Sequence, residues 1–319
     1  MKKIKVGCFG TRAHQIHEQL VNNQYAELAA VAAFDKKIPK GCDNVRVYET
    51  LDQLLADKEV DLVSFCSPVR AEQAGQAVKA MKAGKHVYAE KPCAMKEDEL
   101  DAIIRTSKET GKQFHEMAGV AFHQPYFALR ETVKAGTLGE VIQVIGQKCY
   151  PWTERRASDE NVDGGLGMQV AIYLTRFVEH VACARIKSIE MNETKLGNPV
   201  AGHNCRMAVS IQMTLQNGGL AAGIANYLNP MGGKLWGYEI VRIFGTKGIV
   251  ECSSETHAAR LILNGKEPVM LETATGGFDY FDLYLKSLQG LDRMPFSMEE
   301  ELSPARWIIR AKQGAKLNS

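Results

Sequence analysis

The chain has 319 residues, of which 45% are hydrophobic and 24% are charged. These proportions are ordinary for a globular protein, and the length suffices for a large core and for two domains. The formal net charge of +2 is close to neutral, so it gives no electrostatic case for a nucleic-acid partner or an acidic surface as a partner.

The cysteines and the N-terminus bear on the compartment. The eight cysteines are scattered singly, which is typical of reduced thiols rather than of a disulfide framework. The first residues, MKKIKVGCFG, lack the apolar stretch of a secretory signal. No apolar run approaches the ~20 residues of a membrane span. We therefore expect a cytoplasmic location, with neither a nucleic-acid nor a membrane partner.

The first third of the chain alternates short apolar runs with helical patterns. Strands are predicted at residues 4–9, 26–34, 61–66, 85–90 and 112–119, and helices at residues 13–23, 50–57, 70–84 and 96–111. This alternation indicates an α/β domain with a parallel, doubly wound sheet. Asp35, Ser67-Pro68 and Glu90-Lys91-Pro92 all lie at the carboxyl ends of predicted strands. Because ligands bind beyond the carboxyl ends of such strands, these residues are candidates to line one crevice.

The remainder of the chain has longer strands and few helices. Strands are predicted at residues 140–150, 186–194, 205–216, 219–228, 238–245 and 259–265, and helices at 165–183 and 303–316. Asn217-Gly218 and Asn264-Gly265 are hairpin-turn signals. We therefore predict a first domain over residues 1–122 and an α+β domain with a large, mainly antiparallel open sheet over residues 123–319. The C-terminal helix is a candidate to pack back on the first domain.

The first strand–helix junction, GCFGTRAHQ, is a partial nucleotide-binding motif. A dinucleotide fingerprint would begin at Gly10, but Arg12 and Gln15 hold its second and third glycine positions. Alone, the segment fits an ordinary turn equally well. Asp35 lies where a ribose-binding carboxylate is expected, and Arg12 can donate to a phosphate. Asp35 favours NAD, whereas Lys36 could pair with the 2′-phosphate of NADP.

A longer segment resembles a known family. The stretch DLVSFCSPVRAEQAGQAVKAMKAGKHVYAEKPCAMKEDEL is similar to the glucose-fructose oxidoreductase/inositol dehydrogenase (Gfo/Idh/MocA) family, most specifically in Glu-Lys-Pro after AGKHV. The resemblance implies a Rossmann domain followed by an open-faced α/β domain that carries substrate and oligomer contacts. It also implies oxidation or reduction of sugars, polyols or related compounds with NAD or NADP.

The resemblance assigns roles to residues of the first domain. Lys91 would lie between the nicotinamide and the substrate hydroxyl, where its ammonium stabilises a developing alkoxide. A cis peptide bond between Lys91 and Pro92 is expected. The residues expected to hold the nucleotide are Gly10, Thr11, Arg12, Asp35, Lys36, Ser67, Pro68, Glu90 and Lys91.

The second family signature, Asp-x-Gly-x-His/Tyr, is altered here. The matching segment is QVAIY, so Gln169 replaces the acid and Tyr173 keeps the last position. Glutamine can orient a hydroxyl or carbonyl but cannot ionise. Tyr173 is therefore left to exchange the proton, and a nearby Lys91 ammonium would favour its ionised form. On one helix Gln169, Tyr173, Arg176 and His180 would form a polar stripe, predicted to face the cleft rather than solvent.

Several alternatives stay open. His123 and Trp152 are candidate substrate contacts, but packing roles fit them equally. His14 and His17 lack a third ligand, so no metal site is predicted. The leading prediction is an NAD(P)-dependent dehydrogenase or reductase acting on CH-OH groups. The rivals are a transient-redox elimination or epimerisation enzyme that retains NAD, and a non-catalytic nucleotide-binding sensor. The open sheet predicts a homodimer or homotetramer, since an apolar face needs covering.

Overall fold

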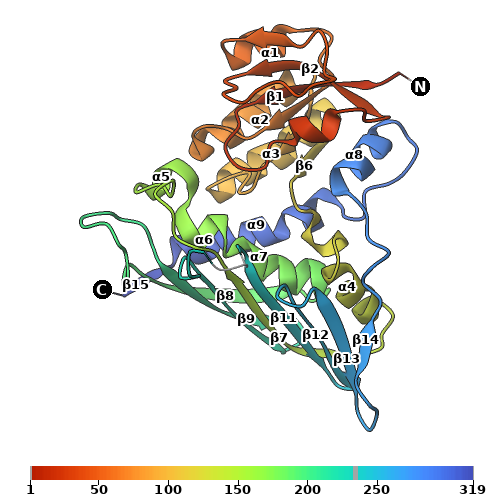
Figure 1. Cartoon of the computed structure of the whole chain (residues 1–319), viewed down its shortest axis with the longest axis vertical. Helices are drawn as coiled ribbons and strands as arrows, with labels where there is room; N and C mark the ends of the chain where they lie inside the picture. The colour runs from red at the N-terminus through yellow and green to blue at the C-terminus, as the bar shows by residue number, and fades with distance from the viewer. Residues whose placement is uncertain (1, 233–235, 319) are drawn as a thin grey trace. The chain divides into compact units, whose positions relative to one another are not determined.

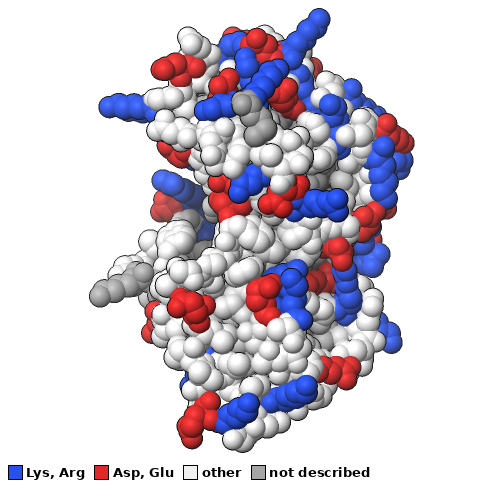
Figure 2. Space-filling model, turned by 90° about the vertical axis from the view of Figure 1, so that its right-hand side faces the viewer, with Lys and Arg blue, Asp and Glu red and all other residues white. Residues whose placement is uncertain are grey.

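The structure is a computed structural model, which describes residues 2–232 and 236–318. The chain divides into two compact units (Figure 1). The first unit runs to Ala118 and adds Tyr280–Leu302, and the second comprises Gly119–Asp279 and Ser303–Ser319. Among the described residues, no helix has the length and apolarity needed to span a bilayer. Figure 2 shows acidic and basic side chains interspersed over the viewed face, in keeping with the near-neutral charge.

The first unit is built on a six-stranded sheet with the order β3-β2-β1-β4-β5-β6, and each neighbouring pair is parallel. The strands are β1 (Ile4–Phe9), β2 (Ala26–Ala32), β3 (Arg46–Tyr48), β4 (Leu62–Phe65), β5 (His86–Ala89) and β6 (Phe114–Glu116). Its helices are α1 (Leu51–Ala56), α2 (Gln73–Lys82), α3 (Glu97–Thr110) and α8 (Tyr280–Leu288). This strand order is that of a dinucleotide-binding Rossmann domain, so the predicted doubly wound sheet is confirmed.

One predicted helix of the first unit is wrong. Residues 13–23 contain only a 3₁₀ helix, η1 (Ile16–Leu20). Ala13 has a positive φ of 81° and Gln15 is extended, with φ −61° and ψ 136°. The buried Gln15 side chain bonds to the strands on either side of the turn, and this tertiary contact overrides the helical periodicity. The short strand β3 was not predicted, because three residues, of which the middle one is exposed, carry little pattern.

The second unit holds a nine-stranded sheet with the order β14-β13-β12-β11-β7-β10-β9-β8-β15. Its strands are β7 (Val141–Cys149), β8 (Ile186–Thr194), β9 (Ala208–Leu215), β10 (Leu220–Asn226), β11 (Tyr238–Gly245), β12 (Gly248–Ser253), β13 (Ala258–Leu263), β14 (Val269–Leu271) and β15 (Lys316–Asn318). Only β7·β10 and β8·β15 are parallel among the described pairs, which confirms a mainly antiparallel sheet. Asn217-Gly218 and Asn264-Gly265 do join antiparallel strands, as predicted.

Helices cover one face of this sheet (Figure 1). They are α4 (Tyr126–Lys134), α6 (Gly165–Gln169), α7 (Ile172–Arg176), the π-helix η4 (Phe177–Val181) and part of α9 (Met298–Gln313). The short helix α5 (Glu160–Asp163) precedes α6 and contacts it. Gly146 and Gly223 lie under this layer, and a Cβ on either would approach Leu174 to 3.2 Å or less. Glycine at both positions therefore lets α7 pack closely on β7 and β10.

The single helix predicted over residues 165–183 is interrupted in the structure. Gln169 ends α6 and Tyr173 lies in α7, so they do not share one continuous helix. Val170, between them, has φ −118°. The predicted apolar stripe is buried as expected, at Leu166, Val170, Leu174, Phe177 and Val181. Arg176 and His180 are also buried, at 1% exposure each, so they do not lie on a solvated face.

Candidate active site

The turn after β1 is shaped by one glycine. Gly10 has a φ of +70°, and a Cβ there would meet the Cys66 carbonyl oxygen at 2.3 Å. Its amide donates to the Ala32 carbonyl at 3.0 Å, and the Arg12 amide donates to the Cys66 carbonyl at 3.1 Å. The chain therefore crosses the carboxyl ends of β1, β2 and β4 here, as a nucleotide-binding turn must.

Polar side chains of the predicted nucleotide site meet beside this turn. The Thr11 hydroxyl donates to Asp35 Oδ1, and Asp35 is exposed after the end of β2. Arg12 Nη1 donates to the Pro68 carbonyl at 3.4 Å. Lys36 is exposed next to Asp35. The turn thus presents a carboxylate and a guanidinium that suit a ribose and a phosphate respectively.

Gln15 explains how the chain tolerates losing the third glycine. Its amide nitrogen donates to the carbonyls of Gly10 at 2.9 Å and Ser64 at 3.2 Å. Its amide oxygen accepts from the Ser64 hydroxyl at 2.7 Å. The buried side chain therefore links β1 to β4 by hydrogen bonds, which we call the Gln15 bracket. It fills the position where a glycine would let a helix pack closely on the strand.

A second glutamine joins the ends of β4 and β5. Gln73 is fully buried and accepts from the Ser67 amide at 3.2 Å. Its amide nitrogen donates to the Glu90 carbonyl at 2.5 Å. The Ser67 hydroxyl donates in turn to Gln76 at 2.6 Å. Gln73 thus fixes Ser67 and the Glu-Lys-Pro segment relative to each other.

The Glu-Lys-Pro segment lies at the carboxyl end of β5, where the sequence predicts it. Glu90 and Lys91 are buried, at 1% and 7% exposure, directly after β5. The bond between Lys91 and Pro92 is cis, which confirms that prediction. Glu90 Oε2 accepts from the His14 amide at 3.1 Å and pairs with the His14 ring at 3.0 Å, while Oε1 accepts from the Lys91 amide at 3.1 Å. These bonds hold the Glu90 carboxylate in one position next to Lys91 in the chain.

The charge state of Glu90 follows from these contacts. Burial by itself raises the pKa of this carboxyl. The His14 hydrogen bond and the positive charge of Lys91 act against burial and outweigh it, so the pKa is lowered to about 2. Glu90 is therefore ionised at neutral pH and gives Lys91 a buried counter-charge.

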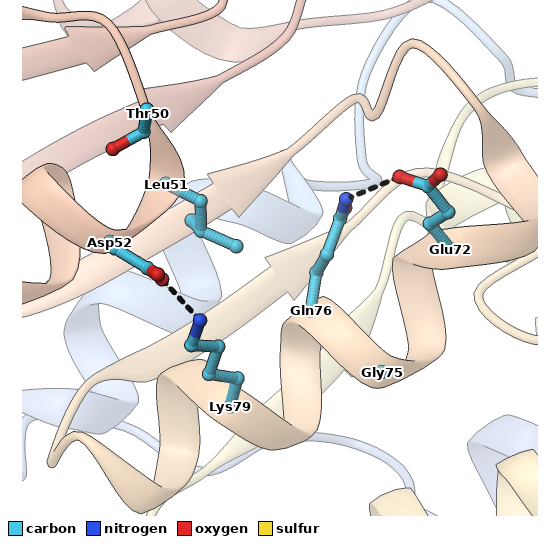
Figure 3. Close-up of a pocket in the computed structure, with 7 residues that line it drawn as sticks. All are labelled: Thr50, Leu51, Asp52, Glu72, Gly75, Gln76 and Lys79. Carbon is cyan, nitrogen blue, oxygen red and sulfur yellow. Dashed lines mark hydrogen bonds and ion pairs between the residues drawn. The ribbon is translucent and has the colours of Figure 1, made fainter.

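A cavity of about 510 Å³ opens at the same edge of the sheet (Figure 3). It lies between the start of α1 and the exposed side of α2, and is lined by Thr50, Leu51, Asp52, Glu72, Gly75, Gln76 and Lys79. An Asp52–Lys79 ion pair crosses one end, and Gln76 donates to Glu72 at 3.2 Å. Gln76 also holds Ser67, so the cavity adjoins the predicted nucleotide residues.

In the second unit, Tyr173 lies among charged and aromatic side chains. The Lys148 ammonium is 4.3 Å from the centre of the Tyr173 ring, and Arg176 lies 5.7 Å from it. Lys148 forms a buried ion pair with Glu239, which also accepts from the Tyr126 hydroxyl. Burial raises the pKa of that hydroxyl, so Tyr126 stays a neutral donor.

The remaining predicted residues of the second unit are more dispersed. Gln169 donates to the Asp163 carbonyl at 2.7 Å, which ties α6 back to α5. Trp152 is half-buried, and its indole nitrogen has no hydrogen-bond partner among the described residues. His123 is exposed on the turn before α4. These positions leave the roles predicted for Gln169, Trp152 and His123 as predictions.

Sequence reasoning missed three contributors to these sites. Gln73 looked like one polar position of an amphipathic helix, and nothing local marks it as a bridge. For His14 the sequence predicts a surface or capping role rather than a metal ligand, and nothing local indicates its bond to Glu90. Lys148 did carry a signal, because it follows Val144 and Gly146 in the alternation of β7 and so points to the covered face of the sheet. A lysine at such a position is rarely left without a function or a counter-charge.

The residues of the first unit fit a dinucleotide. Gly10 occupies a cradle that any Cβ would fill, Asp35 offers a carboxylate, and Arg12 offers a cation. The 3₁₀ helix after this turn has five residues, which is too short to supply a helix dipole, so the guanidinium is the positive charge that the turn offers to a phosphate.

Comparison with known proteins agrees with this geometry. Residues 4–117 match the oxidoreductase family with an NAD-binding Rossmann fold (GFO_IDH_MocA), and residues 126–251 match the GFO/IDH/MocA C-terminal domain. Inositol 2-dehydrogenase of Rhizobium meliloti is 24% identical over 292 residues, covering 86% of this chain and 79% of that protein. An uncharacterised oxidoreductase of Rhizobium meliloti is 26% identical over 182 residues, a match that spans about half of each protein (54%).

Solved structures share the fold. An aldose-aldose oxidoreductase from Caulobacter crescentus, complexed with glycerol, superposes with a TM-score of 0.79 at 20% identity, covering 98% of each chain. An oxidoreductase domain protein from Kribbella flavida has a TM-score of 0.82 at 16% identity, covering 98% of this chain and 97% of that one. Since both halves of the chain match the same family, the protein belongs to the Gfo/Idh/MocA family of NAD-binding Rossmann oxidoreductases.

Proposed function

We propose that the protein transfers a hydride between NAD(P) and a sugar-like or polyol hydroxyl or carbonyl group. The observation that carries this proposal is the end of β5, where the buried Lys91 ammonium follows the buried, ionised Glu90. A lysine held in this way at the carboxyl edge of a Rossmann sheet suits stabilisation of a developing alkoxide.

In this proposal the protein side chains handle binding and the proton. A bound nicotinamide would supply the hydride acceptor for the carbinol carbon. Lys91 stabilises the alkoxide that develops as the hydroxyl proton leaves, Tyr173 exchanges that proton and passes it to water, and Gln169 orients the substrate. His123 and Trp152 are proposed as further substrate contacts.

Different residues of the first unit are proposed to bind different parts of the nucleotide. Arg12 and the Gly10 turn take the phosphates, Asp35 takes a ribose hydroxyl, and Ser67, Pro68 and Glu90 flank the nicotinamide end. The cavity beside Gln76 (Figure 3) is proposed to take part of the nucleotide, because Gln76 is hydrogen-bonded to Ser67 and lines that cavity. The exposed carboxylate of Asp35 favours NAD over NADP by repelling a 2′-phosphate, and Lys36 keeps NADP open.

We also propose that the open face of the second unit's sheet joins copies of the chain into a homodimer or homotetramer. Ile145 on β7 and Leu220 and Ile224 on β10 lie on this face and are each at least 40% exposed, and these two strands are neighbours. Such a row is an interface feature. Ile224→Glu should lower the mass measured by light scattering after gel filtration; an unchanged mass, or a monomeric wild type, would contradict the proposal.

The function is tested by adding NAD and NADP separately in thermal unfolding, followed by reduced-nicotinamide absorbance with a panel of polyols. Ligand at about 100 times its dissociation constant adds ~2.7 kcal/mol to the stability of the native state. Stabilisation together with reduced nicotinamide supports the proposal and names the cofactor. NAD retained through purification with no net reduction would favour transient redox chemistry, and binding without turnover would favour a sensor. Neither stabilisation nor retained nucleotide would overturn all three.

A further inference from the structure

A row of alternating rings and cations runs along one part of the second unit. Its members, in spatial order, are Tyr173, Lys148, Tyr150, Arg156 and Tyr227, and we call them the cation–tyrosine row. Lys148 Nζ lies 4.3 Å from the centre of the Tyr173 ring and 5.0 Å from that of Tyr150. The Arg156 guanidinium carbon lies 5.8 Å from the Tyr150 ring and 4.1 Å from the Tyr227 ring. The row thus begins at the tyrosine proposed to exchange the proton.

The two cations of the row differ in their counter-charges. Lys148 is paired with Glu239. Arg156, within the part of the chain that the structure describes, forms no ion pair, and its buried Nε has no hydrogen-bond partner. Its contacts there are the two tyrosine rings and a main-chain bond from its amide to the Thr153 carbonyl at 3.0 Å.

Two acidic groups that act on Tyr227, the ring under Arg156, have other partners. Glu160 accepts from Lys312 at 2.7 Å, and Asp163 Oδ1 accepts from the Gly165 amide at 2.9 Å. Burial raises the pKa of the Tyr227 hydroxyl and outweighs the opposing effect of the Arg156 charge, so that ring is neutral. Arg156 therefore brings a positive charge to the row that no described side chain cancels.

A guanidinium stacked on aromatic rings is suited to one kind of ligand. Stacking leaves its edge, with the N–H donors in a fixed fork, pointing away from the ring faces, and it reduces the rotamer entropy lost on binding. That fork matches the two oxygens of a carboxylate or phosphate. Tyrosine faces beside it also suit the C–H face of a sugar ring.

We infer that the substrate is an acidic sugar or polyol whose anionic group binds Arg156, within the same row of side chains as Tyr173. This inference rests on the proposed function and specifies its substrate class. The anionic oxygens can belong to a carboxylate, as in a uronate, or to a phosphate ester. Arg156 is thereby a specificity residue: it discriminates anionic from neutral substrates and takes no part in proton or hydride transfer.

The test compares three probes with a common ring: glucose, glucuronate and glucose 6-phosphate. Their dissociation constants are measured by calorimetry for the wild-type chain, with and without saturating NAD. We expect at least one anion to bind tenfold or more tightly than glucose, and the preferred anion to separate the carboxylate from the phosphate. The preference should fall as salt is raised. Equal affinities for the three probes, or binding of neither anion, would overturn the inference.

Three variants assign any preference to the residue. Arg156→Gln is expected to lose the preference for the anion while its affinity for glucose is unchanged. Arg155→Gln, at the exposed neighbouring position, removes the same charge and should keep the preference. Arg156→Lys keeps the charge but not the forked N–H geometry, so it should retain part of the preference for the anion. This variant still tests the inference if Arg156→Gln fails to fold. Equal losses in the Arg155 and Arg156 variants would show a general charge effect and overturn the inference.

The same measurements distinguish this inference from the proposed function. Reduction of NAD with neutral polyols, unaffected by Arg156→Gln, would keep the oxidoreductase and remove the acidic substrate. Arg156-dependent binding of an anion in a chain that binds neither NAD nor NADP would keep the anion site and remove the oxidoreductase.

Discussion

The two units build their sites in different ways. In the first unit the groups that meet a ligand are held by main-chain bonds at strand ends, and three buried side chains, those of Gln15, Gln73 and Glu90, accept from or donate to that main chain. In the second unit the cation–tyrosine row is made by long side chains lying on rings. A site held by main-chain bonds tolerates replacement of a motif glycine only if another side chain supplies new hydrogen bonds, as the Gln15 side chain does here. A site made from side chains can change its specificity without changing the fold.

The largest effect is expected in the first unit, at the group proposed to meet the alkoxide. Lys91→Met should lower kcat by about 10²–10³-fold, the usual cost of removing one preorganised donor from an oxyanion. Binding of NAD, measured by calorimetry, should be little changed, because the turn after β1 does not depend on the lysine side chain.

The matched control for that variant is Lys82→Met, at the exposed end of α2, which should leave kcat and binding as in the wild type. A wild-type kcat in Lys91→Met would remove the lysine from the mechanism. Loss of nucleotide binding in that variant would instead assign Lys91 a structural role.

In the second unit, the counterpart is the ion pair between Lys148 and Glu239. Lys148→Met leaves the Glu239 carboxylate, only 13% exposed, with a buried charge, and breaking such a pair from one side typically costs 3–5 kcal/mol. The free energy of unfolding in urea measures this loss. Adding Glu239→Leu should recover most of it, since an apolar pair replaces the charges.

Lys187→Met, an exposed lysine on β8, controls for the loss of one positive charge on the same sheet and should be neutral within ~0.5 kcal/mol. If the two lysine variants were equally stable, the Lys148 pair would not be a buried, stabilising contact.

The two units also differ in how much of each site could be predicted from the sequence. Asp35, Ser67 and Glu90 could be placed together from the sequence, because alternating strands and helices fix which strand ends share an edge. Gln15 and Gln73 could not, because their partners are main-chain groups distant in sequence and their local patterns are those of ordinary helices. Tertiary contact also replaced the first predicted helix by a 3₁₀ turn.

In the second unit the sheet and its turns were predictable from alternation and Asn-Gly pairs, but the row was not. Lys148 was recognisable as inward-facing from its place in β7. Arg156 lies in an irregular segment with no periodicity, so its contacts with the Tyr150 and Tyr227 rings become apparent only in three dimensions.

Acid tests whether the Glu90 bracket stabilises the first unit. The pKa of Glu90 is about 2 in the folded chain, below its ordinary 4.5, so the unfolded chain binds the proton first as the pH falls. The stabilisation, on the order of 3 kcal/mol, is fully present above pH 4.5 and is lost between pH 4.5 and 2. Glu90→Gln should therefore be less stable than the wild type at neutral pH, with the difference closing towards pH 2.

Urea unfolding at a series of pH values measures both curves, and Glu27→Gln, an exposed carboxylate on β2, serves as the control. Parallel curves for Glu90→Gln and the wild type between pH 4.5 and 2 would show that Glu90 is not a stabilising, ionised group.

The smallest expected effect concerns the bracket that replaces the third glycine. Gln15→Ala removes the acceptor of the Ser64 hydroxyl and the donor to the Gly10 and Ser64 carbonyls. Leaving a buried hydroxyl and carbonyls unsatisfied costs about 1–3 kcal/mol, so the melting temperature should fall. Nucleotide affinity should fall with it, because the turn that carries Arg12 loses its anchor to β4.

Gln19→Ala lies four residues on and is exposed, so it should change neither quantity. If Gln15→Ala lowered the melting temperature but left NAD affinity intact, the turn would be held by its main-chain bonds to Ala32 and Cys66 alone. The first unit would then tolerate loss of a motif glycine without any bracket, and the contrast with the second unit would rest on main-chain bonding only.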